Sequence, residues 1–485
     1  MLLKELLSPW MSLSEQTCEV HGLANDSRKV KPGDLFFAYP GVNVDGRLFM
    51  HQARTSQAAA ILYDTNNAPA DLILPQDIIC IPISTLENKL AAIANRFYGD
   101  PTQELLFTGV TGTNGKTTIA YQLAQAHILL GVATSYIGTI GQGNPLKLEQ
   151  LVNTTPDALV LQSLFREYQQ RNIKQVCMEV SSHALCQQRV ANIPFQQAIF
   201  TNLTHDHLDY HQTMENYAQA KSSLFATQSL KCAIINFDDQ YAKIMQQRLP
   251  GTCDLITYGF NNAATVRVLN WDAQAATVKI QSPWDIHEIP LTGIGKFNVY
   301  NTLAIFISLK VSGYDVYQII DIMRQIKPAP GRMELLHSKP SIIVDYAHTP
   351  DALENVLVTL NILKKGRLIL VFGCGGDRDH RKRPLMGRIA VRYADVIIIT
   401  NDNPRHEKPE DIMLDIMPDL NADKIIYKIL DRAQAIHAAY NLSTAEDIIL
   451  IAGKGHEMYQ QIGDQKLFFS DQKIVQELGM NCIIL

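Results

Sequence analysis

The chain has 485 residues, of which 46% are hydrophobic and 19% charged, and its formal net charge is −5 at pH 7. This length exceeds what a single hydrophobic core organises and predicts about three domains of an ordinary soluble protein. The weakly acidic balance excludes a nucleic-acid partner, because such binding needs a concentrated basic surface.

Segments for export or membrane insertion are not expected. Met1–Leu13 lacks a basic flank followed by a long apolar run, and no later stretch approaches about eighteen uninterrupted apolar residues. Eight cysteines occur at positions 18, 80, 177, 186, 232, 253, 374 and 482, without a Cys-x-x-Cys pair. This spacing predicts reduced thiols in a cytoplasmic protein.

The first block of the sequence, to about residue 90, predicts a small α/β domain. Short apolar runs cover residues 35–38, 58–63 and 78–83, and Pro-Gly and Asp-Gly turns separate them. Apolar runs of this length between turn residues are typical of buried strands.

The second block contains the most informative motif. Residues 109–118 read Gly-Val-Thr-Gly-Thr-Asn-Gly-Lys-Thr-Thr, between an apolar run at 104–110 and a helical apolar pattern. Glycines let backbone N–H groups turn toward phosphates, Lys116 can reach the β and γ oxygens, and the Thr117 hydroxyl can bind Mg²⁺. Val110 occupies the position at which the general P-loop pattern has its first glycine. The motif predicts binding of a nucleoside triphosphate.

The rest of this block alternates apolar strands with helical stretches, which predicts a doubly wound parallel sheet. The strands are expected at 176–180, 197–202 and 232–236. Glu179 lies at the end of the first of them, where P-loop enzymes place an acidic Mg²⁺ ligand. A capping or surface carboxylate is the alternative for Glu179.

A histidine-rich stretch follows at 201–211, Thr-Asn-Leu-Thr-His-Asp-His-Leu-Asp-Tyr-His. Its similarity to His-x-His-x-Asp-His allows a dinuclear zinc hydrolase, since clustered imidazoles and a carboxylate ligate such metals. Tyr210 stands where the third histidine belongs, and phosphate-bound Mg²⁺ prefers oxygen ligands. The favoured interpretation is a single imidazole, His207, beside a second Mg²⁺, with loop-capping histidines as the plainer alternative. Lys221 lies on a helical stretch, and this context alone predicts a solvated surface lysine.

A Pro-rich hinge at 327–332 opens the third block. Apolar runs at 342–345, 368–372, 396–400 and 448–452 each end in polar residues or glycine. They predict buried parallel strands with ligand-binding loops at their carboxyl ends, as in a Rossmann-like domain.

Several motifs, in this order, resemble those of the Mur ligase family. They are the glycine-rich cradle, Met178-Glu-Val-Ser-Ser-His-Ala-Leu185, the stretch 201–211, Ala220-Lys221, Gly295-Lys-Phe-Asn-Val-Tyr-Asn301, Gly331-Arg-Met-Glu334 and Asp345-Tyr-Ala-His-Thr-Pro350. The resemblance extends from Asp26-Ser27-Arg28 to Ser470-Asp471 and covers nearly the whole chain. It implies an α/β fold of three domains: an N-terminal UDP-substrate-binding domain at 1–90, a central ATP-binding P-loop domain at 91–330, and a C-terminal Rossmann-like, amino-acid-binding domain at 331–485.

The resemblance also implies site residues. Lys116, His207 and Lys221 would act in catalysis, and carbamylation would turn Lys221 into a carboxylate-like Mg²⁺ ligand. ATP would contact Gly112, Thr113, Asn114, Gly115, Lys116, Thr117, Thr118, Asn298 and Arg332. Mg²⁺ would be held by Thr117, Glu179, His207 and carbamylated Lys221. The UDP substrate would contact Ser27, Asn153, Thr154, Thr155, Ser181, Gln187 and Arg189, while the nearby loop 41–46 departs from the family pattern.

The acceptor amino acid would bind in the third domain, at Arg378, Asp402, Asn403, Pro404, Arg405, Gly453 and Glu457. The tetrapeptide Asp402–Arg405 matches family members that add diaminopimelate, whereas lysine-adding relatives lack its arginine. A guanidinium can hold the second carboxylate of diaminopimelate bidentately, and Glu457 would pair with an ammonium group. Without the resemblance, the tetrapeptide indicates only a turn after a strand.

The implied function is ATP-driven addition of meso-2,6-diaminopimelate to the D-glutamate γ-carboxylate of UDP-N-acetylmuramoyl-L-alanyl-D-glutamate through an acyl phosphate. This reaction serves peptidoglycan synthesis, and with it cell shape and division, in the cytoplasm, and a monomer is expected. Alternatives are a lysine-adding ligase and a folylpolyglutamate synthetase-like ligase, although the latter follows its lysine with glycine and serine, not Thr117-Thr118. A non-catalytic P-loop module would need neither Lys221 nor an amino-acid pocket.

Overall fold

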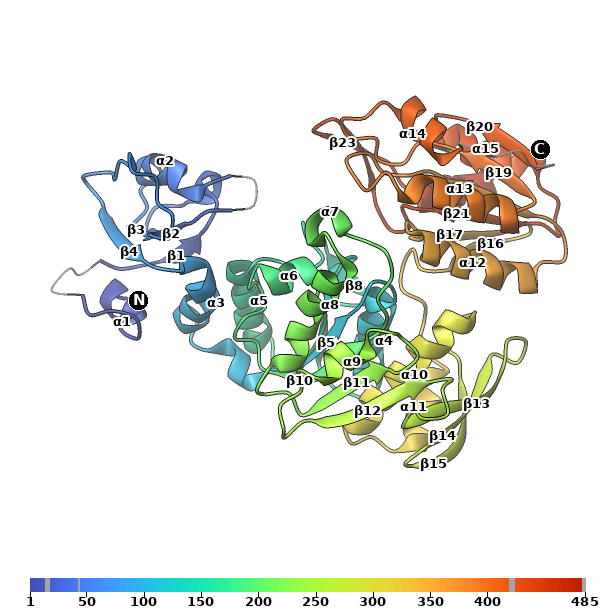
Figure 1. Cartoon of the computed structure of the whole chain (residues 1–485), viewed down its shortest axis with the longest axis horizontal. Helices are drawn as coiled ribbons and strands as arrows, with labels where there is room; N and C mark the ends of the chain where they lie inside the picture. The colour runs from blue at the N-terminus through green and yellow to red at the C-terminus, as the bar shows by residue number, and fades with distance from the viewer. Residues whose placement is uncertain (14–17, 42–43, 418–423, 482–485) are drawn as a thin grey trace. The chain divides into compact units, whose positions relative to one another are not determined.

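The structure is a computed structural model that describes residues 1–13, 18–41, 44–417 and 424–481. The chain divides into two compact units. The first contains residues 1–108, 132–196 and 227–229, and the second contains residues 109–131, 197–226 and 230–485. Both combine helices with mainly parallel sheets, which confirms the predicted α/β class (Figure 1). No helix in the described ranges is long and apolar enough to cross a membrane.

A parallel sheet begins the first unit, in the order β1 (Gly22–Ala24), β2 (Asp34–Ala38), β3 (Ala60–Asp64) and β4 (Ile79–Ile83). Successive residues of β2 point to opposite faces. Leu35 and Phe37 share a core with α1 (Leu3–Leu7) and α3 (Leu86–Phe97), whereas Phe36 packs with α2 (Met50–Thr55). Because helices cover both faces, these strands are apolar almost throughout, which is why the three predicted runs correspond to β2, β3 and β4.

The remainder of the first unit pairs β6 (Thr134–Gly138) with β9 (Gln175–Glu179) in parallel, and β6 continues through antiparallel β7 (Gly141–Asn144) to β8 (Lys147–Glu149). Asp157 and Ser181 start the two helices of this part, because their side chains accept hydrogen bonds from backbone N–H groups of the first turn. The helices are α5 (Ala158–Gln170) and α6 (Ser182–Cys186), and the unit's 3-10 helices are η1 (Ser27–Lys29), η2 (Gly46–Phe49) and η3 (Pro101–Glu104).

In the second unit, β10 (Phe195–Phe200), β11 (Cys232–Asn236), β12 (Asp254–Gly259) and β13 (Val266–Asp272) are parallel neighbours. β14 (Thr277–Ser282) and β15 (Asp285–Pro290) extend this sheet with antiparallel pairing. The prediction of a parallel sheet for the central block therefore holds for β10 to β13 but not for β14 and β15, which pair antiparallel. Buried Val278 and Ile280 alternate with exposed Lys279 and Gln281, the pattern of a sheet covered on one face only.

The helices of this region follow the strands in sequence. β5 (Leu106–Thr111) leads into α4 (Lys116–Leu129), which contacts the long α10 (Lys296–Val311). α10 is hydrophobic on nearly all sides because it is buried along most of its length. The others are α7 (Leu208–His211), α8 (Met214–Ser222), η4 (Ser223–Ala226), α9 (Ala242–Gln246) and α11 (Val316–Met323).

The C-terminal sheet has the order β16 (Glu334–Ser338), β17 (Ser341–Asp345), β21 (Ile448–Ala452), β18 (Leu368–Phe372), β19 (Val396–Ile399) and β20 (Ile425–Lys428). Only β16 is antiparallel to its neighbour. One face packs on α12 (Pro350–Leu363), α13 (Lys382–Tyr393) and α14 (Pro409–Ile416), the other on α15 (Arg432–Leu442) and α16 (Asp471–Asn481), and a hairpin of β22 (Tyr459–Ile462) and β23 (Gln465–Phe468) follows β21.

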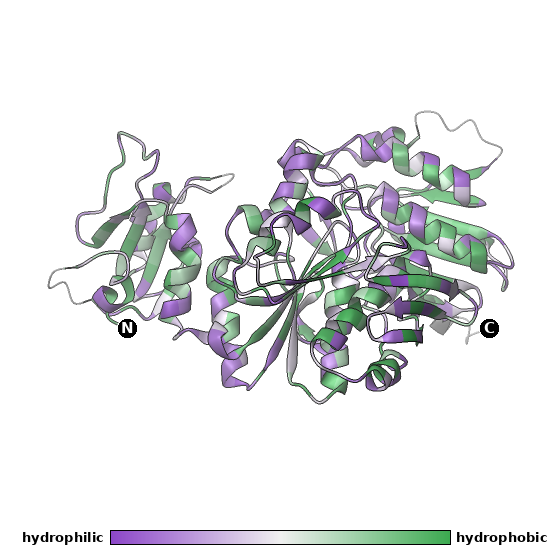
Figure 2. Cartoon of the chain, turned by 60° about the horizontal axis from the view of Figure 1, so that its bottom comes forward, coloured by the Kyte–Doolittle hydropathy of each residue, from purple (hydrophilic) through white to green (hydrophobic). Residues whose placement is uncertain are grey.

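The four C-terminal strands expected from the sequence are present as β17, β18, β19 and β21. Figure 2 shows hydrophobic residues concentrated along the strands and hydrophilic residues on the outer sides of the helices. Strands covered on both faces carry no polar positions to signal an alternation, so they appear in the sequence as continuous apolar runs. Their carboxyl ends carry the loops described below.

A fully buried ion pair holds one end of this sheet together. The Arg432 guanidinium donates to both Asp471 oxygens at 2.8 Å, and also to the Ala452 carbonyl at 3.0 Å, and neither charged side chain is exposed. We expect Arg432→Met to destabilise this part by about 3–5 kcal/mol, because it leaves the Asp471 carboxylate buried without its partner. Thermal unfolding measures the effect. Arg392→Met, at a side chain 72% exposed, is the matched control and should barely change the melting temperature.

Candidate active site

The glycine-rich loop between β5 and α4 forms a tight cradle. Gly112 and Gly115 have φ angles of +147° and +88°, which L side chains rarely adopt. A Cβ on Gly112 would lie 1.8 Å from the Thr201 hydroxyl, and one on Gly115 would lie 2.7 Å from Asn301 Oδ1. Gly115 directly precedes α4, so the first backbone N–H groups of that helix are available to an anion.

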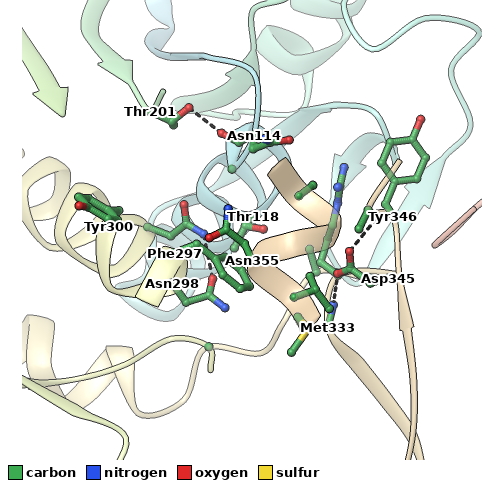
Figure 3. A pocket seen from close by; sticks show the side chains of 18 of the residues that line it. Asn114, Thr118, Thr201, Phe297, Asn298, Tyr300, Met333, Asp345, Tyr346 and Asn355 are labelled. Atoms are coloured by element: carbon green, nitrogen blue, oxygen red, sulfur yellow. Dashed lines mark hydrogen bonds between the residues drawn. The ribbon is translucent and has the colours of Figure 1, made fainter. Parts of the chain in front are cut away.

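Residues at the end of β10 support the cradle. Thr201 Oγ1 donates to the Asn114 carbonyl at 2.6 Å, and the Asn114 N–H donates to Asn202 Oδ1 at 2.9 Å. Figure 3 shows the contact between Thr201 and Asn114. Asn236, at the end of β11, donates in turn to the Thr201 carbonyl at 2.7 Å. Thr201 and Asn202 belong to the stretch 201–211, but the sequence alone assigns them no role, because their partners are distant in sequence.

Two lysines converge on one carbonyl oxygen of the cradle. Lys116 Nζ donates to Gly112 O at 3.0 Å and to Thr113 O at 2.8 Å. Lys221 Nζ, from α8, donates to the same Gly112 oxygen at 2.8 Å and lies 4.5 Å from the Tyr217 ring centroid. Lys221 is only 1% exposed. Its interpretation as a solvated surface lysine is therefore wrong, whereas the position implied by the family resemblance agrees with this burial.

The imidazoles of the histidine-rich stretch do not lie together. His205 Nε2 is 2.9 Å from Asp379 Oδ2, while His211 is buried and stacks on Tyr217 with ring centroids 4.8 Å apart. His207 lies 3.4 Å from Asp206 Oδ2. Over the described ranges there is no group of three or more His, Cys, Asp or Glu side chains arranged to hold a metal ion. The zinc-hydrolase alternative thus gains no support from the geometry.

The electrostatics of this stretch favour a negative charge on Asp206. Its burial alone would raise the carboxyl pKa, but the positive charges of His207, His348, Lys382 and Lys116 lower that pKa to about 2. Burial has the opposite consequence for His348, whose pKa falls to about 4, with Lys382 adding to the decrease. The site therefore contains an ionised carboxylate and a neutral imidazole at neutral pH.

A cavity of about 760 Å³ opens beside the cradle, entirely within the second unit (Figure 3). Its size suits a nucleotide. Among the residues predicted to bind ATP, those that line it are Asn114, Gly115, Thr118, Asn298 and Arg332. Lining residues that the sequence analysis did not assign include Phe297, Tyr300, Tyr346, Asp351 and Asn355.

Two side chains define opposite parts of this cavity. The Asn298 amide, on α10, donates to the Ile294 carbonyl at 2.7 Å and accepts from Asn301 Nδ2 at 2.8 Å. Arg332 donates to the Thr117 hydroxyl at 2.9 Å, and its guanidinium carbon lies 4.5 Å from the Tyr346 ring centroid. Asn114 Nδ2 also donates to Asp351 Oδ2 at 2.9 Å. Hydrogen bonds at its mouth thus connect the cradle to the segment that precedes β16 and to α12.

The predicted UDP-substrate residues lie in the first unit, where several form one network. Thr155 Oγ1 donates to the Glu179 carbonyl at 2.8 Å and accepts from the Ser181 N–H at 3.1 Å. Arg189 donates to the Thr155 carbonyl at 2.9 Å and to Gln187 Oε1. The hydroxyl oxygens of Thr154 and Thr139 are 3.1 Å apart. Thr154, Thr155, Ser181, Gln187 and Arg189 therefore lie close together, although up to 35 positions separate them in the sequence.

The remaining first-unit predictions are Ser27, Asn153 and Glu179. Ser27 is buried and donates to Gln52 Oε1 at 2.8 Å, and Asn153 is exposed. Glu179 has no exposed surface: its Oε1 accepts from Tyr136 OH at 2.5 Å and from the Thr139 N–H at 2.9 Å. Val42 and Asn43 of the loop 41–46, like Cys482, lie outside the described residues.

The predicted amino-acid pocket is assembled by loops at the carboxyl ends of β18, β19 and β21. Asn403 donates to Glu457 Oε2 at 2.9 Å, and Arg405 donates to the Gly376 carbonyl at 2.7 Å. Gly453 leaves room for Asp402, since a Cβ there would lie 2.7 Å from Asp402 Oδ2. Pro404 is buried beside them, whereas Arg378 is exposed and donates to the Asp377 carbonyl at 3.4 Å.

The fold and the cradle together define an α/β protein of the P-loop nucleotide-binding class. Three family models match the chain: "Mur ligase family, catalytic domain" at residues 19–98, "Mur ligase middle domain" at 110–309 and "Mur ligase, glutamate ligase domain" at 331–455. The chain belongs to the Mur ligase family and is an ATP-dependent ligase that forms amide bonds.

Curated relatives and solved structures agree with this assignment. The chain is 42% identical over 461 residues to UDP-N-acetylmuramoyl-L-alanyl-D-glutamate--2,6-diaminopimelate ligase of Coxiella burnetii, covering 93% of this chain and 94% of that protein. It is 43% identical over 465 residues to the protein of the same name from Neisseria meningitidis serogroup A, covering 93% of each. A solved structure with that name has a TM-score of 0.69 at 32% identity and covers both chains fully. MurF from Thermotoga maritima, solved with ADP, shares the fold with a TM-score of 0.62 at 16% identity over 95% of this chain and 97% of that chain.

The close approach at Gly112 gives a test of the cradle. We expect Gly112→Ala to weaken ATP binding by at least about tenfold, because the added methyl group must displace the Thr201 hydroxyl and because Gly112 has a φ that alanine rarely adopts. Isothermal titration with ATP measures the change. Gly131→Ala is the control, since Gly131 also has a positive φ, of +83°, but has open space around its Cβ position. Equal loss of ATP binding in both variants would contradict the assignment of the cradle.

Proposed function

We propose that the protein adds meso-2,6-diaminopimelate to the D-glutamate γ-carboxylate of UDP-N-acetylmuramoyl-L-alanyl-D-glutamate, with ATP as the energy source. One observation carries the choice of amino acid: Asn403, Arg405 and Glu457 meet at one set of loop ends, where a guanidinium and a carboxylate can grip opposite ends of a diamino acid. The names of the relatives, which are over 40% identical along nearly the whole chain, support the same substrates.

The reaction begins with ATP in the cavity beside the cradle. The D-glutamate γ-carboxylate attacks the γ-phosphorus, the bond from that phosphorus to the β,γ-bridging oxygen breaks, and ADP leaves. Lys116 lies over the cradle, where its ammonium neutralises charge that spreads over the phosphoryl oxygens. The product is an acyl phosphate, which activates the carbonyl carbon for the second step.

The second step forms the amide bond. An unprotonated amine of diaminopimelate attacks the activated carbonyl, and the tetrahedral intermediate collapses with release of phosphate. Glu457 binds the ammonium that does not react, and Arg405 binds a carboxylate. The Arg405 hydrogen bond to Gly376 O anchors one edge of its guanidinium and so orients the group. Positioning of the amine in this way, more than acid–base chemistry, accounts for the specificity.

Mg²⁺ fits the donor set near the cradle: a hydroxyl from Thr117, an imidazole from His207 and, if Lys221 is carbamylated, a carbamate oxygen. Bound Mg²⁺ would neutralise the phosphate charge of ATP. Glu179, in the first unit, stays a predicted ligand. Two ammonium groups on the single oxygen Gly112 O repel each other, and carbamylation of Lys221 removes one of these positive charges.

The domain limits proposed are 1–90 for UDP-substrate binding, 91–330 for ATP binding and 331–485 for amino-acid binding. The hydrophobic cores on both faces of the C-terminal sheet support the last of these limits, whereas the core beneath the first sheet also includes Ala158 and Leu159 of the central block. The substrates are intermediates of peptidoglycan precursor synthesis, and we place the enzyme in the cytoplasm as a monomer. No further partner is needed for the chemistry.

Phosphate release tests the proposed reaction. With ATP, Mg²⁺ and the UDP-muramoyl dipeptide, we expect turnover with meso-diaminopimelate and little with L-lysine. Arg405→Ala should lower kcat/KM for diaminopimelate by about a hundredfold, because it removes a charge-assisted contact to the second carboxylate. Arg388→Ala, on the exposed side of α13, is the control. Efficient turnover with lysine would replace the proposed acceptor, and no acceptor-dependent turnover would contradict the ligase reaction.

Carbamylation of Lys221 has a direct test. After equilibration with ¹³C-bicarbonate, the wild-type protein should show a carbamate carbonyl resonance by NMR that Lys221→Arg lacks. The Lys221→Arg variant should also lose at least about 99% of ligase turnover, since arginine cannot supply a carboxylate-like ligand. Identical spectra of the two proteins at the pH of the assay would contradict carbamylation.

A further inference from the structure

Lys454 is a buried cation that the proposed reaction does not use. It follows Gly453 in the loop after β21, and its side chain has no exposed surface. Lysine is rarely buried to this extent without a partner, because removing an ammonium group from water is costly. The partners of Lys454 are therefore informative about its function.

Its ammonium group closes a triangle with two residues of the amino-acid pocket. Lys454 Nζ donates to Asn403 Oδ1 at 3.0 Å and to Glu457 Oε2 at 3.0 Å. Asn403 Nδ2 donates to the same Glu457 oxygen at 2.9 Å. All three side chains come from loops at the carboxyl ends of strands, and each side of the triangle is one hydrogen bond.

This triangle fixes the orientation of the Asn403 amide. Its Oδ1 accepts from Lys454 Nζ and also from the Gln461 backbone N–H at 2.9 Å. A flipped amide would place its NH₂ group against both of these donors. The Asn403 NH₂ group consequently faces Glu457, and two donors converge on Glu457 Oε2. The Glu457 carboxylate is held in one orientation, with Oε1 on its other side.

Lys454 also balances the charge beneath the pocket. Asp402 is buried next to it, and burial by itself would raise the pKa of that carboxyl. The positive charges of Lys454 and Arg432 outweigh burial and lower the Asp402 pKa. Asp402 therefore stays ionised next to Lys454.

We propose that Lys454 is a positioning residue. By orienting Asn403 and Glu457 toward the ammonium group of the acceptor amino acid, it sets the affinity for that acceptor. This inference rests on the proposed function, because it requires that Glu457 bind the acceptor. Lys454 acts through these two side chains and does not touch the acceptor itself. The alternative is a buried counter-ion for Asp402 that only stabilises the fold.

Steady-state kinetics of Lys454→Met separate the two roles. We expect KM for diaminopimelate to rise by about tenfold to a hundredfold, because a charged hydrogen bond to Glu457 is lost. KM values for ATP and for the UDP-muramoyl dipeptide should stay within about twofold. Lys466→Met is the matched control, since Lys466 is exposed and its Nζ lies 4.3 Å from the ring of Tyr459, the same ring that Lys454 approaches at 5.5 Å.

A double-mutant cycle with Glu457→Gln tests whether Lys454 acts through Glu457. If it does, Lys454→Met should raise KM for diaminopimelate much less in the Glu457→Gln background than in the wild type. Additive effects on KM would overturn the proposal. A fall in kcat with unchanged KM for diaminopimelate would overturn it as well, because that result indicates a smaller fraction of folded enzyme.

A second variant guards against unfolding of Lys454→Met. Lys454→Gln retains a hydrogen-bond donor without the charge and should show a smaller rise in KM at a melting temperature close to that of the wild type. If neither variant folds, Lys454 is a structural counter-ion and the proposal is wrong. If the wild type turns over L-lysine but not diaminopimelate, the proposed acceptor is wrong. The role of Lys454 is then tested by the change that Lys454→Met causes in KM for L-lysine.

Discussion

The close packing around Gly112 is the constraint on which the rest of the active site depends. Its carbonyl oxygen accepts hydrogen bonds from Lys116 and Lys221, and its missing Cβ leaves the space that the Thr201 hydroxyl occupies. Thr201 in turn holds the Asn114 carbonyl and is held by Asn236. One peptide unit therefore fixes the loop, both lysines and the end of β10 relative to one another.

The cavity proposed for ATP lies in the second unit, between this cradle and the hinge that precedes the C-terminal sheet. Arg332 contacts Thr117 and stacks on Tyr346, so a side chain from the hinge reaches the residue after the P-loop lysine. The same sheet carries the proposed amino-acid pocket on its loops, where Asn403, Glu457 and Lys454 are joined by hydrogen bonds. In the proposed function, a single group of strands therefore contributes to the binding of both nucleotide and acceptor.

Much of this arrangement could be predicted from the sequence, and the exceptions have physical causes. The strands β17, β18, β19 and β21 are recognisable because both faces are buried and the runs are wholly apolar. The antiparallel extension by β14 is not recognisable in the sequence, because exposed Lys279 and Gln281 interrupt its apolar residues. The burial of Lys221 has no local signature, since its partner Gly112 is 109 residues away, and Lys454 likewise contacts Asn403, which is 51 residues away.

Transfer of an oxygen atom from substrate to phosphate is the most direct test of the proposed acyl-phosphate mechanism. The UDP-muramoyl dipeptide would be prepared with ¹⁸O in the D-glutamate γ-carboxylate, turned over with unlabelled ATP and diaminopimelate, and the released phosphate analysed by mass spectrometry. In a reaction through an acyl phosphate, one carboxylate oxygen leaves with the phosphoryl group. We therefore expect one ¹⁸O atom in each phosphate released. Phosphate without ¹⁸O, formed together with the amide product, would contradict it.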